Sequence, residues 1–140
     1  MKNIITAFAT DDGQTFMDRH FGDAESFNIY EINSTKVNFL KTISNTIEEE
    51  DEDEDVHADP TKAKGIAGLL KKEKVQVVVS KVFGPNIKRI KKKFVCIITQ
   101  EKEINDSIQN IQKNMDIIIQ EWEKGEARNF INAKIFSKNN

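Results

Sequence analysis

The chain has 140 residues and a net charge of −2, which predicts a single domain with one hydrophobic core. No apolar run approaches the length of about 18 residues that indicates a membrane span. The single cysteine, Cys96, excludes a disulfide within the chain and a cluster site built from several of its thiolates. The first residues lack the apolar region and cleavage site of a signal peptide, so we expect a cytoplasmic protein.

The charge is unevenly distributed along the chain. Residues 48–55 are eight consecutive acidic residues, and without them the net charge would be +6. Lysine and arginine concentrate between residues 71 and 93. A basic region of this kind attracts anionic ligands, or it forms a solvated helix face. Adjacent like charges repel one another and bury nothing, so we expect an acidic, mobile loop over residues 44–58.

Three β-strands are predicted in the first part of the chain. Residues 3–9 form a short apolar run that ends at a turn sequence, which is typical of a buried strand. Residues 26–32 are rich in aromatic and β-branched side chains, and apolar and polar residues alternate over residues 36–43. An Asn-Ser turn separates these two segments, so we expect them to pair as a β-hairpin.

A helix and a strand–helix–strand unit are predicted after the acidic loop. An Asp-Pro pair, which is favourable at a helix start, opens an apolar helical face over residues 59–72. A β-branched run over residues 75–79 and an apolar run over residues 94–99 flank a short helix at about residues 85–92. Strands connected in this way are parallel, and the crossover is right-handed in nearly all proteins.

A long amphipathic helix is predicted near the C-terminus. Its apolar stripe, with spacings of three and four residues, consists of Ile104, Ile108, Ile111, Met115, Ile118 and Trp122. The stripe indicates packing on the sheet, and the alternative is a homodimer through this helix, because the same spacing suits a coiled coil. We expect residues 127–140 to extend beyond a domain formed by residues 1–126, and either an added edge strand or a loosely packed segment would fit their apolar residues. The element order predicts an α/β fold with a mixed sheet and helices on both faces.

No set of residues for nucleophilic catalysis is visible. Cys96 lies within an apolar run, which favours a buried structural thiol over a reactive one. The chain lacks a phosphate-binding loop, a dinucleotide fingerprint and a nucleophile elbow. Asp11 and Asp12 follow the first strand, where ligands bind in α/β sheets, but Asp-Asp-Gly is also a common turn sequence. A metal-dependent hydrolase using Asp11 is the least favoured function, because no further carboxylates complete its site.

The two histidines are candidate metal ligands. His20 lies between the first two strands and follows Arg19, whose guanidinium can meet an anion. Phe21 is a candidate anchor for this loop, and Gly22 allows a sharp turn. His57 ends the acidic loop and is a candidate ligand of a cation held there. A single histidine in a loop is also a common surface residue.

A second candidate binding element follows the strand at residues 75–79. The sequence Phe83-Gly84-Pro85-Asn86 opens the short helix there. Free backbone amides at the start of a helix attract anions, and Lys81, Lys88 and Arg89 add positive charge nearby. Gly84, Pro85, Asn86 and Lys81 are therefore candidate residues of an anion-binding site.

Six short motifs in this chain resemble those of one family in order and spacing. They are Ala9-Thr10-Asp11-Asp12-Gly13, His20-Phe21-Gly22, Tyr30-Glu31-Ile32, Lys64-Gly65-Ile66-Ala67, Phe83-Gly84-Pro85-Asn86 and Trp122-Glu123-Lys124-Gly125-Glu126. The chain resembles the dinitrogenase iron–molybdenum cofactor biosynthesis family, which includes small cofactor carriers and the C-terminal domain of a radical enzyme of cofactor assembly. The resemblance covers about residues 1–126.

The resemblance implies a ribonuclease H-like fold, with a five-stranded mixed sheet whose second strand is antiparallel. It implies a protein without enzymatic activity that binds or carries an iron–molybdenum cofactor, or an iron–sulfur cluster precursor, in nitrogenase cofactor assembly. It also implies that His20 is the cofactor-binding residue. A preassembled cluster brings its own sulfides, so one imidazole and nearby positive charge from Arg19 and Lys81 would suffice. Asp11 is expected at the same site.

The expected partners are the metal cluster and nitrogenase cofactor-assembly proteins, with neither nucleic acid nor a membrane among them. One alternative remains open. The same fold would also serve as a protein-interaction or regulatory module without any link to nitrogenase, acting through the acidic loop and the long C-terminal helix. Loss of metal binding with retained partner binding would distinguish the two functions.

Overall fold

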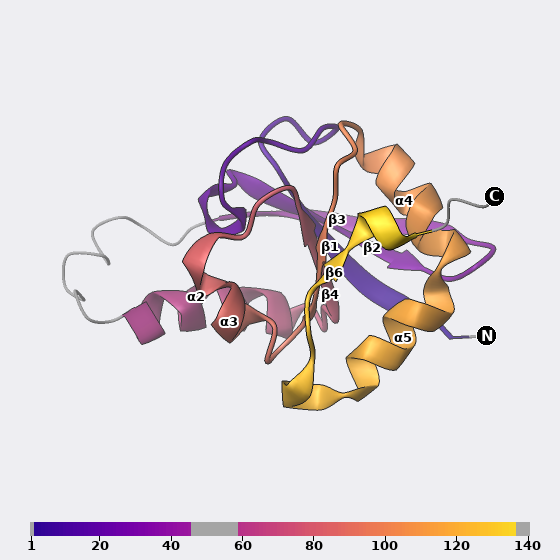
Figure 1. The fold of residues 1–140 in the computed structure, drawn as a ribbon. Coiled ribbons are helices and arrows are strands. Elements are labelled where there is room, and N and C mark those ends of the chain that lie inside the picture. Colours follow the sequence, from indigo (N-terminus) through magenta and orange to yellow (C-terminus); the bar gives the residue numbers. More distant parts are fainter. Residues whose placement is uncertain (1, 46–58, 137–140) are drawn as a thin grey trace.

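The computed structural model describes residues 2–45 and 59–136, and in it a six-stranded sheet stands between two layers of helices (Figure 1). The strands are β1 (Ile4–Thr10), β2 (Ser26–Ile32), β3 (Val37–Ser44), β4 (Val77–Ser80), β5 (Val95–Ile98) and β6 (Ile131–Asn132). The α-helices are α2 (Asp59–Lys72), α3 (Ile87–Ile90), α4 (Ile104–Lys113) and α5 (Met115–Glu123). Short 3₁₀ turns are η1 (Phe21–Asp23), η2 (Gly84–Asn86), η3 (Gly125–Ala127) and η4 (Ala133–Ile135).

The sheet is mixed, with the strand order β3-β2-β1-β4-β5-β6. Strand β2 runs antiparallel to both β1 and β3, whereas β4 runs parallel to β1, and β5 and β6 continue in that direction. The predicted hairpin of β2 and β3 and the parallel β4–α3–β5 unit are therefore confirmed. The antiparallel direction of the second strand is also as expected.

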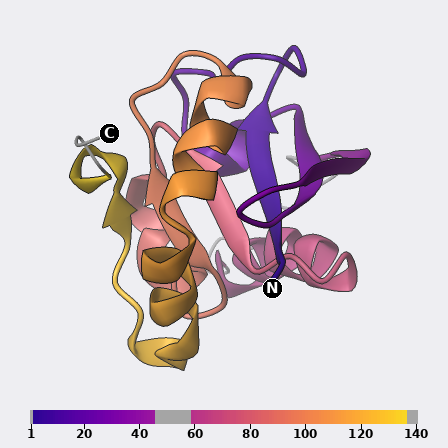
Figure 2. The same ribbon diagram turned by 90° about the vertical axis from the view of Figure 1, so that its right-hand side faces the viewer.

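Alternating side chains of the sheet form two separate cores. On β1, Ala7 and Ala9 face α2 and α3, while Ile4 and Phe8 face α4 and α5. Figure 1 shows these helix pairs on opposite sides of the strands, and Figure 2 shows the α4–α5 layer in front of the sheet with the β2–β3 hairpin extending beyond it. Helices cover both faces of the sheet, as the element order predicts.

The sheet has six strands rather than the five expected. The sixth strand, β6, has two residues and pairs with β5, where Ile131 lies opposite Ile97. A strand this short has no alternation pattern that would reveal it in the sequence. Ile131 and the nearby Phe136 are buried in the core beneath α4 and α5, so the described part of the C-terminal extension packs into the same body.

The long helix expected from its apolar stripe is two helices, α4 and α5, which meet at Asn114. Asn114 leaves the helical conformation, with φ −127° and ψ 30°, and its side-chain amide donates to the Asn110 carbonyl at 2.8 Å. An asparagine side chain competes in this way for helical carbonyl groups. The stripe from Ile104 to Ile118 remains buried against the sheet across the break, as its sheet-packing interpretation predicts. The homodimer alternative stays a prediction. None of the described helices has the length and apolar composition needed to cross a membrane.

Candidate functional site

Two loops meet at the carboxyl ends of β1 and β4, the neighbouring parallel strands in the middle of the sheet. The chain passes from β1 to β2 on one side, whereas β4 lies on the other side of β1. Ligands of open α/β sheets bind at such a switch point. The loop after β1 is joined to the loop after β4 by a β-bridge between His20 and Val82 and by the Phe21 amide, which donates to the Val82 carbonyl at 2.8 Å.

An aromatic layer lies beneath this junction. The buried ring of Phe21 stacks on Phe83 with centroids 5.1 Å apart and planes inclined by 26°. Phe21 also lies 5.1 Å from the ring of Phe27 on β2. The expected role of Phe21 as the anchor of its loop agrees with this packing. Because Phe21 is buried, it holds the backbone of the neighbouring, exposed His20 in place.

The imidazole of His20 rests against Gly84. Gly84 has φ +75°, and a Cβ placed there would lie 2.6 Å from His20 Nδ1. His20 is exposed, and neither of its ring nitrogens has a hydrogen-bond partner within the part of the chain that the structure describes. The ring is therefore supported by packing while its nitrogens remain available to a ligand.

A hollow of about 170 Å³ opens beside this imidazole. Its lining consists of His20, Gly22, Asp23, Ile66, Phe83, Pro85, Asn86 and Ile90. The structure thus brings together His20, Gly22, Pro85 and Asn86, which sequence reasoning placed in two distant motifs. It adds Ile66 from α2, which lies in one of the family-like motifs, and Ile90 from α3, for which the sequence carries no comparable signal.

Two of the expected cationic residues are already engaged in ion pairs. Arg19 pairs with Asp11 at 2.5 Å and donates to the Asp23 carbonyl at 2.7 Å. Lys81 pairs with Asp18 at 3.2 Å. Neither Arg19 nor Lys81 is among the residues that line the hollow at His20.

Two other basic residues lie close to the hollow without such partners. Lys88 and Arg89 belong to α3, between the lining residues Asn86 and Ile90, and both are exposed. Within residues 2–45 and 59–136 neither forms an ion pair. Lys81 is nearer to Gly84 in the sequence, but it is paired with Asp18. Lys88 and Arg89 are the next basic residues after Gly84, and their charges are not paired within the described chain.

Asp12 serves the turn after β1. Its carboxylate accepts hydrogen bonds from the Thr15 amide at 2.7 Å, the Gln14 amide at 2.8 Å and the Thr15 hydroxyl at 2.8 Å. These bonds lower the pKa of Asp12 to about 2. Burial opposes ionisation of Asp11, but hydrogen bonds from Arg19 and the Glu25 amide hold the pKa of Asp11 below its usual value. Both carboxylates therefore have structural partners, as the turn interpretation predicts.

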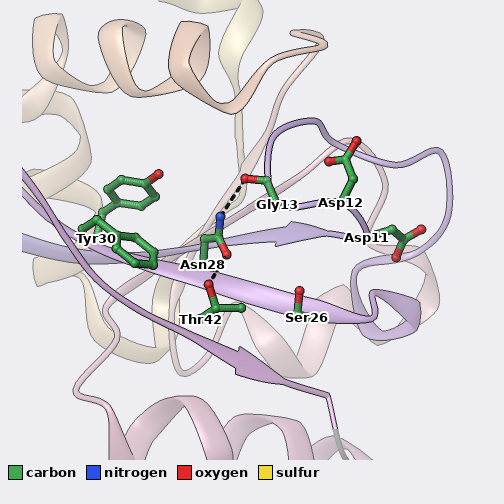
Figure 3. Close-up of a pocket in the computed structure, with 8 residues that line it drawn as sticks. Asp11, Asp12, Gly13, Ser26, Asn28, Tyr30 and Thr42 are labelled. Carbon is green, nitrogen blue, oxygen red and sulfur yellow. Dashed lines mark hydrogen bonds between the residues drawn. The ribbon is translucent and has the colours of Figure 1, made fainter.

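Asp11 and Asp12 line a different depression from the one at His20. This groove, of about 520 Å³, also involves Asn28, Tyr30, Phe39 and Thr42 (Figure 3). Asn28 donates to the Gly13 carbonyl at 2.9 Å and accepts from the Thr42 hydroxyl at 2.7 Å, so its polar atoms are satisfied within the chain. Although the groove is larger, no histidine or cysteine lines it, and we place the site at the hollow beside His20.

The donor set for a metal centre is small. Within the described ranges, 2–45 and 59–136, no group of three or more histidine, cysteine, aspartate and glutamate side chains could hold a metal ion. Cys96 is buried in β5, and burial raises the pKa of its thiol to about 12. His57, the other candidate ligand, lies outside the described residues. His20 and Asp23 are thus the candidate donor residues in the lining of the hollow, and His20 is the one that the sequence predicts.

Fold and site together define an α/β domain with a small hollow at the switch point of its sheet, where ligands of such sheets bind. The family model described as dinitrogenase iron-molybdenum cofactor matches residues 2–114, and the chain belongs to this family, as the resemblance indicated. Five of the six motifs lie within the matched residues, and the motif at residues 122–126 lies beyond them. Among solved structures, a protein from Methanocaldococcus jannaschii described as a candidate dinitrogenase is similar, with a TM-score of 0.57 and 22% identity over 81% of this chain and 92% of that chain. At this identity the likeness shows the fold alone. No protein of curated function matches the chain.

Proposed function

We propose that this protein binds and carries an iron–molybdenum cofactor, or an iron–sulfur precursor of it, for nitrogenase cofactor assembly, without catalysing a reaction itself. The observation that carries the proposal is the exposed imidazole of His20, which is supported by Gly84 and has both nitrogens free of hydrogen bonds from the described residues. Imidazole nitrogen is a suitable ligand for iron. The family to which the chain belongs supports the choice of this metal cluster as cargo.

One protein ligand suits a carrier better than an enclosed cage. A preassembled cluster already has its sulfides, so it needs the protein only for attachment and orientation. The hollow of about 170 Å³ is smaller than the roughly 300–1,000 Å³ of sites that enclose small molecules. Cargo would therefore lie across its mouth, attached through His20, where a receiving protein can reach it.

Two basic residues beside the hollow favour an anionic cargo, while Asp23 in its lining carries the opposite charge. Lys88 and Arg89 on α3 are exposed and form no ion pairs among the described residues. They can therefore bind an anion without first breaking an existing ion pair. Arg19 and Lys81 form surface pairs, and such pairs contribute about 1 kcal/mol or less. A cluster carrying several negative charges can therefore recruit these side chains as well. In this proposal Asp11 contributes indirectly, by holding Arg19.

The proposal is tested by anaerobic incubation with isolated iron–molybdenum cofactor, followed by gel filtration and measurement of iron and molybdenum in the protein fractions. The wild type is expected to retain the cofactor in stoichiometric amount, and His20→Ala is expected to lose it. His57→Ala is the matched control, because these are the two histidines of the chain. Equal retention by wild type and His20→Ala, or no retention by the wild type, would contradict the proposal.

A second candidate function, a protein-interaction module without a link to nitrogenase, is favoured by the surface of β3. This strand lies at the edge of the sheet and exposes Val37, Phe39 and Leu40, with exposed fractions of 36%, 53% and 46%. Long edge strands with exposed apolar side chains are prone to pair with another chain. A wild type that captures a protein partner but no cofactor, and a Phe39→Ser/Leu40→Ser variant that loses the partner, would favour this function.

A further inference from the structure

We infer that Gly84 is a positioning residue for His20, because the missing side chain at position 84 leaves the space in which the imidazole packs. The role of the His20 ring as a metal ligand rests on the proposed function, whereas the packing of the ring against Gly84 is independent of it.

The distances show how the ring and the glycine meet. A Cβ at Gly84 would lie 2.6 Å from His20 Nδ1 and 2.8 Å from both Cγ and Cε1, whereas real Cβ atoms essentially never approach other atoms within 3.0 Å. Because these three distances are nearly equal, the Cβ position of residue 84 lies over the face of the imidazole ring. An approach in the ring plane, along the Nδ1 lone pair, would leave Cγ and Cε1 much farther away than Nδ1. Gly84 therefore supports the face of the ring and does not block its edge, where the two nitrogens lie.

The backbone of His20 is held in place from both sides. The bridge to Val82 and the bond from the Phe21 amide to the Val82 carbonyl fix it to the loop after β4. The His20 carbonyl also accepts from the Asp23 amide at 2.8 Å. Because the buried Phe21 ring stacks on Phe83, the segment cannot move away as a unit without breaking the aromatic layer. A side chain at position 84 would thus turn the imidazole out into solvent rather than shift the loop.

Loss of this support would weaken metal binding without removing the ligand. A ring that is free to rotate must be ordered when the metal binds, and this ordering lowers affinity. Gly84→Ala is therefore expected to retain His20 and still bind the cofactor about tenfold less tightly.

The chain offers a matched control for backbone strain. Gly84 has φ +75°, a conformation that side chains other than glycine rarely adopt, so Gly84→Ala would combine strain with the clash. Gly125 has φ +63°, and a Cβ there would meet nothing within 4 Å. Gly125→Ala therefore introduces a similar strain without touching His20, and the difference between the two variants isolates the contact with the ring.

The packing is tested on the ligand-free protein by a double-mutant cycle of thermal unfolding. Gly84→Ala is expected to lower Tm more when His20 is present than in the His20→Ala background, where the ring that it strikes is missing. Gly125→Ala is expected to lower Tm equally in both backgrounds. The NMR signals of the His20 ring should shift in Gly84→Ala and stay in place in Gly125→Ala. An equal fall in Tm for Gly84→Ala in both backgrounds, with unshifted His20 signals, would overturn the inference.

The effect on binding is measured with isolated iron–molybdenum cofactor under anaerobic conditions. Gly125→Ala should bind as tightly as the wild type, whereas Gly84→Ala should bind about tenfold more weakly. If Gly84→Ala does not fold, Gly84→Asn replaces it, since asparagine tolerates positive φ and still carries a Cβ. Wild-type affinity in the folded variant would overturn the positioning role. Absence of binding by the wild type would instead refute the proposed function, and the unfolding cycle would still decide whether Gly84 positions the ring.

Discussion

The ring of Phe21 stacks on that of Phe83, with centroids 5.1 Å apart, and joins the loop after β1 to the loop after β4 beneath the exposed His20. The two residues come from segments more than sixty positions apart, which local sequence patterns cannot relate to each other. This contact supports the hollow from below, because it fixes the residues next to His20 and Gly84 in a buried layer.

We predict that Phe21→Ala lowers the free energy of unfolding by about 3–5 kcal/mol, since Phe21 is fully buried and its removal leaves a cavity. Urea denaturation measures the change. Phe39→Ala is the control, because Phe39 is 53% exposed, and we expect it to lose about 1 kcal/mol or less. Equal losses in the two variants would show that the aromatic layer does not support the loops.

Arg128 is predicted to hold the C-terminal segment to the body. Its guanidinium donates to the Trp122 carbonyl at 3.0 and 3.1 Å and to the Lys92 carbonyl at 3.0 Å, and it lies 4.2 Å from the centroid of the Trp122 ring. Arg128→Ala removes these three hydrogen bonds and the contact with the Trp122 ring, and we expect a loss of about 3 kcal/mol in urea denaturation. Arg89→Ala, at an exposed residue without an ion pair in the described chain, should change stability by about 0.5 kcal/mol or less. Equal unfolding midpoints for the two variants would rule out this role.

Cys96 is predicted to be inert in the native protein. It lies in the buried strand β5, and burial raises the pKa of its thiol to about 12, so the reactive thiolate is scarce at neutral pH. A thiol reagent such as DTNB should react at the rate of unfolding and become fast only in denaturant. Rapid, complete reaction under native conditions would contradict the buried position.

Asp12 is predicted to make stability sensitive to acid. Its pKa is lowered from 3.8 to about 2 in the folded protein, so folding favours the carboxylate form. The resulting stabilisation is fully present above pH 3.8 and is lost as the pH falls through about 2. The stability difference between wild type and Asp12→Asn, measured by denaturation at several pH values, should therefore shrink over this interval. A difference that does not depend on pH would show that these hydrogen bonds do not favour the carboxylate.

Local patterns predicted most elements of the fold. The β-branched and aromatic run at residues 26–32 coincides with β2, and the Asp-Pro pair begins α2 at Asp59 as expected. The two misjudged features depend on contacts that periodicity does not record. Strand β6 exists because Ile131 pairs beside Ile97, and the expected long helix ends at Asn114 although its apolar spacing continues. The ribonuclease H-like classification stays a prediction.

The sequence predicted those parts of the candidate site that lie within recognisable motifs. The family-like motifs around His20 and Gly84 do converge, because parallel neighbouring strands end at the same edge of a sheet. The partners of Arg19 and Lys81 were not predictable, since ion pairs with Asp11 and Asp18 depend on the course of a loop. For the same reason, Asp11 lies at the groove of Figure 3 rather than at the hollow beside His20.

The central claim is that His20 ligates the metal of a carried cofactor, and pulsed EPR of the bound, paramagnetic cofactor tests it most directly. Only two histidines occur in the chain, so protein labelled with ¹⁵N-histidine has just His20 and His57 as labelled sites. We predict a histidine nitrogen coupling in the wild type that changes with the label and persists in His57→Ala, whereas His20→Ala retains neither the bound cofactor nor the coupling. An unchanged coupling in His20→Ala, or no histidine coupling in the loaded wild type, would contradict the account.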